Sequence, residues 1–185
     1  MKKSIANIAD YVGQDVIIRV DRNHLDGSLL SGFAVGISDK LLLLHLIEYN
    51  TFLLNGYSAI RLSDIHSFKV DETFVSRALR LLQRTPVMPD GIELAGWAEV
   101  LTSALFKYPL VKIQTEKKEP GYFFIGRVAK QTKGYVALEK VDSDGLWIEP
   151  GRFEFKDITQ VGFDDGYTKT LAYLVEREAE TAIKV

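Results

Sequence analysis

One pattern of residues occurs twice in this chain, and it constrains the fold more than any other feature of the sequence. A glycine, an alternating apolar pair, an Asp-Ile step and an aspartate followed by an aromatic residue recur in the same order. The first copy consists of Gly32, Ile60, Leu62, Asp64, Ile65, Phe68, Asp71 and Phe74, and the second of Gly126, Phe153, Phe155, Asp157, Ile158, Val161, Asp164 and Tyr167. The spacing between the copies is nearly constant (126 − 32 = 94 and 157 − 64 = 93). Solenoid repeats are shorter, so this pattern indicates a duplicated small domain.

The repeat divides the 185 residues into two similar halves. We expect a first helix-barrel-helix repeat at 1–84, a linker rich in proline and turn residues at 85–91, and a second repeat at 92–185. Domains of this size bury only about 60–70% of their unfolded surface. We therefore expect the two halves to pack on each other and to share stability.

Each half follows the same order of predicted elements: a helix, a meander of short strands, and a second helix. Alternating apolar runs separated by turn residues predict strands at 16–20, 29–37, 41–47 and 59–69, and at 110–115, 122–129, 134–141 and 152–163. Helices are expected at 4–12, from Asp71 to about 85, at 92–106 and from Asp164 onward, with the two aspartates as N-caps. Gly32 and Gly126 fall inside a strand in each half, where glycine permits the bend that a small barrel requires.

Comparison of the two copies predicts which side chains face a core and which face outward. Positions that are apolar in both copies alternate with a period of two, as the buried face of a strand does. They pair Leu30 with Phe124, Ala34 with Val128, Leu42 with Val136, Leu44 with Leu138, Ile60 with Phe153, and Leu62 with Phe155. Other positions are apolar only in the first copy, since Phe33 corresponds to Arg127 and Leu46 to Lys140.

We hypothesise that the outer face of the first half is covered by the second half or by another subunit. This face is represented by Phe33, Leu41, Leu43 and Leu46, which form a candidate interaction surface. The alternative is that these are scattered surface residues, because exposed apolar side chains are common.

The segment from Ile60 to Ile65, which follows a bent strand with glycine and a hydrophobic strand, resembles the Sm-like small β-barrel family. In that family the late strand reads Ile-Arg-Gly, one residue, Asn-Ile, whereas this chain has Leu62 in place of the glycine and Asp64 in place of the asparagine. The similarity covers 16–68 and, more faintly, 110–163. The chain also resembles a class of uncharacterised bacterial proteins built from the same repeat.

The resemblance implies a mainly β protein with flanking helices (α+β), in which two tandem Sm-like or SH3-like small β-barrels form a pseudo-dimer. It also implies barrel edges that pair into rings or dimers. The residues that hold a base in RNA-binding Sm proteins are not matched. Their positions fall near Ser38 and Leu42, and a leucine cannot hydrogen-bond a base edge. In the second copy Glu154 replaces Arg61, so we do not expect recognition of the Sm type.

Composition excludes several classes of function. The net charge is −2, and the 23 basic and 25 acidic residues are interspersed, so the chain has no field that would attract polyanions. It has no cysteine, which excludes disulfides, thiolate zinc sites and thiol nucleophiles. Asp10 and Asp15 interrupt the segment after Met1 before the apolar core of a signal peptide can form. We expect a cytoplasmic protein without a membrane partner.

The sequence contains no motif for catalysis, a metal or a cofactor, and we predict none of these. His24, His45 and His66 all lie in the first copy and lack the spacing of a metal site. Asp64 and Asp157 recur and could do acid–base chemistry if they faced each other. A structural role is favoured, in which each accepts backbone hydrogen bonds.

The function we expect is a non-enzymatic interaction or scaffold module. It would bind a protein partner, or itself, through barrel edges and the apolar face of the first copy. The alternative is a binder of single-stranded nucleic acid through Arg19, Arg61 and Arg127, which would have to converge with Arg22 and Lys112. An enzyme with Asp64 or Asp157 in a pocket beside a histidine ranks third.

Overall fold

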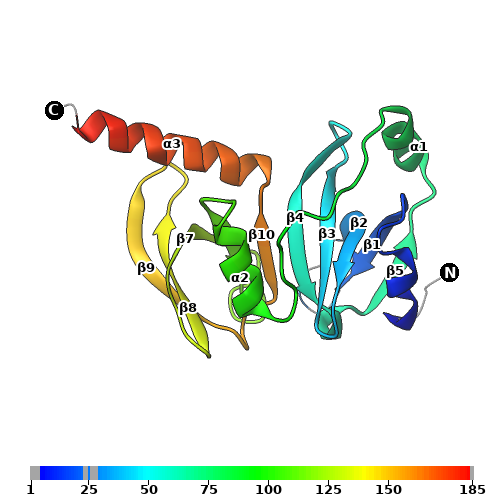
Figure 1. Cartoon of the computed structure of the whole chain (residues 1–185), viewed down its shortest axis with the longest axis horizontal. Coiled ribbons are helices and arrows are strands. Elements are labelled where there is room, and N and C mark those ends of the chain that lie inside the picture. The colour runs from blue at the N-terminus through cyan, green and yellow to red at the C-terminus, as the bar shows by residue number, and fades with distance from the viewer. Residues whose placement is uncertain (1–4, 23–24, 26–28, 184–185) are drawn as a thin grey trace.

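The computed structural model describes residues 5–22, 25 and 29–183. They form one antiparallel sheet of ten strands, with three α-helices and two short 3₁₀ helices among the described residues (Figure 1). The first half contains η1 (Ile5–Tyr11), β1 (Ile17–Asp21), β2 (Leu30–Ile37), β3 (Leu41–Glu48), β4 (Leu53–Arg61), η2 (Leu62–Asp64), β5 (Ser67–Val70) and α1 (Phe74–Leu81). The second half contains α2 (Trp97–Leu105), β6 (Val111–Gln114), β7 (Phe124–Gln131), β8 (Tyr135–Val141), β9 (Trp147–Glu154), β10 (Gln160–Phe163) and α3 (Gly166–Ile183).

The sheet is open and continuous, so the prediction of two closed small β-barrels is wrong. The strand order is β5-β1-β2-β3-β4-β10-β6-β7-β8-β9. Neither half closes on itself. In the sheet order, β4 is the last strand of the first half, and it pairs with β10, the first strand of the second half. In this junction Tyr57 lies opposite Phe163 and Ile60 lies opposite Gln160. The coarser prediction of a mainly β protein with a few helices holds.

The order of strands within the first half is repeated in the second. The first half runs β5-β1-β2-β3-β4 and the second runs β10-β6-β7-β8-β9.

Two long strands predicted from the sequence are each divided. The segment 59–69 turns through η2 between β4 and β5, and the segment 152–163 contains the end of β9 and all of β10. Asn55 and Gly56 lie within β4, where the pairing with β3 shifts register.

The recurring aspartates do not cap the helices in the way the sequence indicates. Thr73 is the N-cap of α1, and Asp71 instead accepts the Thr73 N–H at 2.9 Å. At α3, Asp165 rather than Asp164 accepts a first-turn N–H, from Thr168 at 2.9 Å. The helix expected at 4–12 is the 3₁₀ helix η1.

The larger of the hydrophobic cores covers one face of the sheet across both halves. On the first half this face carries Phe33, Leu41 and Leu43, and it continues over the junction to Val161 and Phe163. The chain between α1 and α2 crosses in front of this face, and α2 follows it (Figure 1). Their apolar side chains in this core are Met88, Ile92, Leu94, Trp97, Val100, Leu101 and Ala104. The opposite face of the first half packs in a second core with η1.

Candidate functional site

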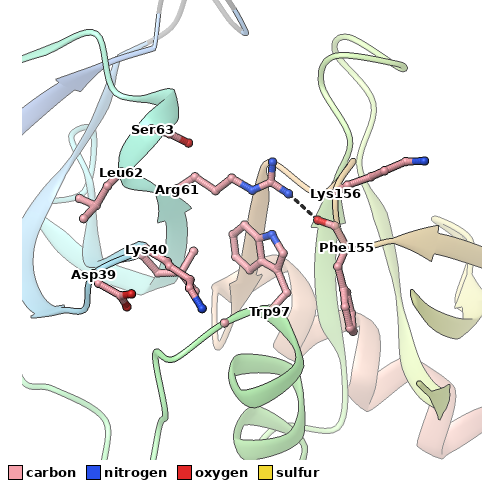
Figure 2. Close-up of a pocket in the computed structure, with 10 residues that line it drawn as sticks. Asp39, Lys40, Arg61, Leu62, Ser63, Trp97, Phe155 and Lys156 are labelled. Atoms are coloured by element: carbon pink, nitrogen blue, oxygen red, sulfur yellow. Dashed lines mark hydrogen bonds between the residues drawn. The ribbon is translucent and has the colours of Figure 1, made fainter. Parts of the chain in front are cut away.

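A pocket of about 520 Å³ opens where the two halves meet, and we call it the seam pocket (Figure 2). Its lining comes from the turn between β2 and β3, the end of β4 with η2, the start of α2, and the residues just after β9. The lining residues are Asp39, Lys40, Leu41, Arg61, Leu62, Ser63, Gly96, Trp97, Phe155 and Lys156. Both halves therefore contribute to the pocket.

Arg61 reaches from the end of β4 toward the second half, as Figure 2 shows. Its guanidinium carbon lies 5.8 Å from the centroid of the Trp97 ring, and Nη2 donates a hydrogen bond to the Phe155 carbonyl oxygen. Lys40 Nζ donates to the Ala95 carbonyl oxygen at 3.3 Å, and Lys156 pairs with Glu154 at 2.8 Å. In the part of the chain that the structure describes, no carboxylate pairs with Arg61 or Lys40.

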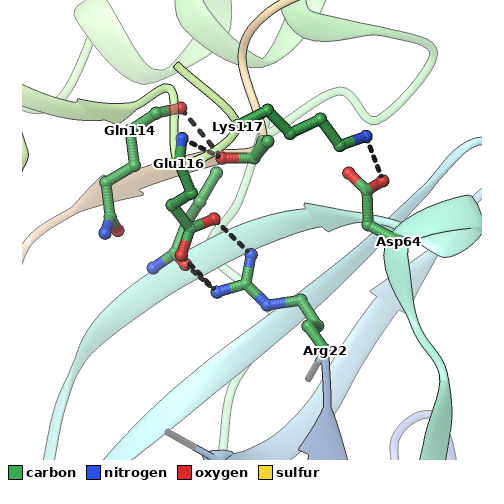
Figure 3. Close-up of polar contacts among 7 residues, drawn as sticks. Arg22, Asp64, Gln114, Glu116 and Lys117 are labelled. Atoms are coloured by element: carbon green, nitrogen blue, oxygen red, sulfur yellow. Dashed lines mark hydrogen bonds and ion pairs between the residues drawn. The ribbon is translucent and has the colours of Figure 1, made fainter. Parts of the chain in front are cut away.

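A buried charge cluster joins the halves next to the junction (Figure 3). Arg22 donates to both carboxylate oxygens of Glu116, at 2.9 and 3.0 Å, and to Gln160 Oε1 at 2.8 Å. Arg22 is 1% exposed and Glu116 is 4% exposed. Since removing one partner of such a pair leaves a buried charge, this cluster fixes the two halves against each other.

The two recurring aspartates bind different lysines. Asp64 is buried and pairs with Lys117 of the other half at 2.8 Å (Figure 3), and Asp157 pairs with Lys118 at 2.6 Å. They do not form the paired carboxylates that acid–base chemistry requires. The described residues contain no group of three or more histidine, aspartate or glutamate side chains that could hold a metal ion.

His45 and His66, the two histidines within the described residues, do not belong to a metal-binding cluster. His24 lies outside the described residues, and His66 is exposed. His45 stacks on Tyr57 with ring centroids 4.3 Å apart, and its Nδ1 accepts the Val87 N–H at 3.4 Å. Burial lowers the pKa of His45 to about 4, so this side chain is neutral at pH 7.

The candidate interaction surface lies inside the molecule. Phe33, Leu41 and Leu43 are at most 2% exposed, and Leu46 is half-buried. The four residues do not share one face, because Leu46 packs against the core on the opposite face of the sheet. A partner cannot dock on Phe33, Leu41 and Leu43 without displacing the segment that covers their core. This covering explains why the first copy is apolar at Phe33, Leu41 and Leu43, because these side chains lie in one core with residues of the second half.

The five cations named for nucleic-acid binding are distributed over the molecule. Arg19 lies on β1 and pairs with Asp71, whereas Arg127 lies on β7 and pairs with Glu139. These strands are six positions apart in the sheet, roughly 29 Å at the usual strand spacing. Arg22 is buried, as described above. Lys112 on β6 pairs with Asp165 at 2.8 Å. Of these five cations, only Arg61 lines the seam pocket and has no carboxylate partner among the described residues.

The sheet ends at β5 in the first half, and this edge has no neighbouring strand among the described residues. Asp71 N–H donates to Ile17 O at 2.8 Å, and Lys69 lies opposite Arg19 in the ladder with β1. Hydrogen-bonding directions alternate along a strand, so the N–H and C=O groups of Val70 point away from β1. β5 therefore presents backbone groups that can pair with another strand.

The other edge, β9, is protected. Phe155 N–H donates to Gly134 O at 2.9 Å, and the same alternation turns the N–H of position 152 away from β8. Position 150 is a proline, which has no N–H, and Glu149 and Arg152 beside it are charged and exposed. Proline and charge on an edge strand oppose pairing with further strands.

Sequence reasoning named Arg61 and Leu41 as candidate site residues, and Leu62 and Phe155 as core positions, but missed the other residues of the seam pocket. Trp97 and Lys156 belong to the second half, and no repeat or motif connects them to the end of β4. The only sequence feature that pointed to this site was Arg61, which lies in the segment that resembles the Sm-like family.

Comparisons with protein-family models, with curated proteins and with solved structures find no match for this chain. Within the described residues, none of the helices combines the length and the apolar character needed to cross a membrane.

Proposed function

We propose that this chain is a non-enzymatic interaction module that binds a protein partner by adding an extended segment of that partner to the free edge of β5. The observation that supports the proposal is the pairing of β4 with β10 inside the chain. β10 is the end strand of the second half and pairs on one side with β6, as β5 pairs with β1. β10 uses its other side to bind β4, and the corresponding side of β5 is open among the described residues.

Strand addition suits such an edge, because backbone hydrogen bonds provide affinity and alternate side chains provide specificity. The four residues of β5 include exposed Lys69 and half-buried Val70, so the edge is accessible beside them. We take the module to act in the cytoplasm, as the sequence leads us to expect.

The proposed partner is a different protein rather than a second copy of this chain. In a second copy, the counterpart of β4 is β9, and Pro150 stands where β4 has Tyr57 (150 − 57 = 93). The exposed side chains of β9 also include the charged Glu149 and Arg152. Both features oppose a head-to-tail assembly of this chain.

A labelled peptide that copies β4, residues 53–61, is the probe for this proposal. We expect it to bind the full chain, measured by fluorescence anisotropy, because it reproduces the strand that β10 accepts. The variant Val70→Pro should abolish the binding without disturbing the β1 ladder, since the Val70 N–H points away from β1.

The matched control peptide carries proline at the position of Ala59, which lies opposite Val161 in the junction. Leu62 N–H donates to Lys40 O, so the alternation turns the Ala59 N–H toward β10. This peptide should not bind. Equal binding of the native peptide to the wild-type chain and to a folded Val70→Pro variant would contradict the proposal.

A further inference from the structure

We propose that the seam pocket binds a small anionic ligand with a flat aromatic body, such as an aromatic carboxylate or a nucleoside monophosphate. The site is separate from the β5 edge and does not depend on the function proposed for that edge. Its size, about 520 Å³, is within the range of pockets that hold small molecules.

The charges of the lining select an anion. Lys40, Arg61 and Lys156 provide three positive charges against the single carboxylate of Asp39. Lys156 is partly compensated by Glu154, but no carboxylate pairs with Lys40 or Arg61 in the described residues. A guanidinium binds carboxylate and phosphate oxygens through parallel hydrogen bonds. Within the described part of the chain, Arg61 donates a single hydrogen bond, to the Phe155 carbonyl oxygen.

The start of α2 lies beside the pocket, and the Glu99 carboxylate in its first turn offsets part of the positive charge of this helix end. Gly96 is its N-cap and makes no side-chain capping bond, and both Gly96 and Trp97 line the pocket. Helix N-termini carry a partial positive charge that favours nearby anions. This contribution supplements the cations and does not form the site by itself.

The apolar part of the lining selects a flat ring. Trp97 and Phe155 come from the second half, and Leu41 and Leu62 come from the first. Trp97 is 6% exposed, so its indole is held in the core and presents only a small part of its surface. Aromatic and aliphatic walls around a few polar groups are the usual composition of a ligand site.

Isothermal titration calorimetry at low ionic strength tests the proposal with two anions and their neutral counterparts. The probes are adenosine 5′-monophosphate against adenosine, and 2-naphthoate against 2-naphthamide. We expect at least one anion to bind the full chain with one-to-one stoichiometry, and at least tenfold more tightly than its neutral counterpart. The two pairs distinguish a phosphate from a carboxylate as the preferred group.

The variant Arg61→Gln should weaken binding of the anion at least tenfold, because it removes the unpaired charge and keeps a hydrogen-bond donor. Arg127→Gln is the matched control. Arg127 also lies over a tryptophan, at 4.6 Å from the ring centroid of Trp147, but it is outside the pocket and pairs with Glu139. This variant should bind as the wild type does.

Lys40→Gln provides a second variant if Arg61→Gln fails to fold, and it should also weaken the anion while leaving the neutral probe unchanged. Absence of binding by both anions at about millimolar concentration would overturn the proposal. Equal affinity for an anion and its neutral counterpart, or equal losses in Arg61→Gln and Arg127→Gln, would overturn it as well.

Discussion

At the scale of single residues, the buried pair of Arg22 and Glu116 links the two halves. Glu116→Gln would leave the Arg22 guanidinium buried without its carboxylate, and we expect a loss of about 3–5 kcal/mol in the free energy of unfolding. Urea-induced unfolding measures this loss. Glu139→Gln, which breaks the exposed pair with Arg127, should cost less than about 1 kcal/mol. Equal effects of the two substitutions would show that the buried pair does not hold the halves together.

His45 makes stability depend on pH. Burial lowers its pKa to about 4, so the folded chain keeps His45 neutral while the unfolded chain takes up a proton near pH 6.5. The contribution of neutral His45 to the free energy of unfolding is therefore complete above pH 6.5, and it decreases as the pH falls toward 4. The variant His45→Gln should have a smaller loss of stability over this interval, measured by urea unfolding at several pH values. His66→Gln, at an exposed position, is the matched control variant.

At the scale of strands, the recurring glycines allow two strands to approach closely. A Cβ atom at Gly32 would collide with the His45 carbonyl oxygen, and one at Gly126 would collide with that of Glu139. We expect each alanine variant to lose about 1–3 kcal/mol in the free energy of unfolding. Gly134→Ala is the control, because a Cβ there meets no atom within 4 Å. Thermal unfolding distinguishes the three variants.

The sequence predicted the parts of the fold that depend on local pattern. The alternation of apolar residues located most strands. The comparison of copies singled out Phe33, Leu41 and Leu43, which lie in the larger core rather than on an outer face. It could not predict the junction, because the pairing of β4 with β10 joins residues about a hundred positions apart, and an edge strand accepts many partners. The seam pocket depends on that junction, so Trp97 and Lys156 carried no signal of their own.

At the scale of the whole molecule, the two sheet edges differ in whether they can pair with a further strand. Pro150 removes a donor from β9, at the place where β4 has Tyr57. We expect Pro150→Tyr to promote association between β9 of one molecule and β5 of another, seen by light scattering as a mass that increases with protein concentration. Adding Val70→Pro to this variant should reverse the increase. An unchanged mass in Pro150→Tyr would indicate that Pro150 does not protect this edge.

The most direct test of the docking edge is amide hydrogen exchange, measured with and without the peptide of residues 53–61. Binding at the edge of β5 predicts slower exchange of the Val70 amide, because a new backbone hydrogen bond would protect it. The amides of β9 should exchange at the same rate in both samples. Protection of β9, or of neither edge while the peptide binds elsewhere, would contradict the account.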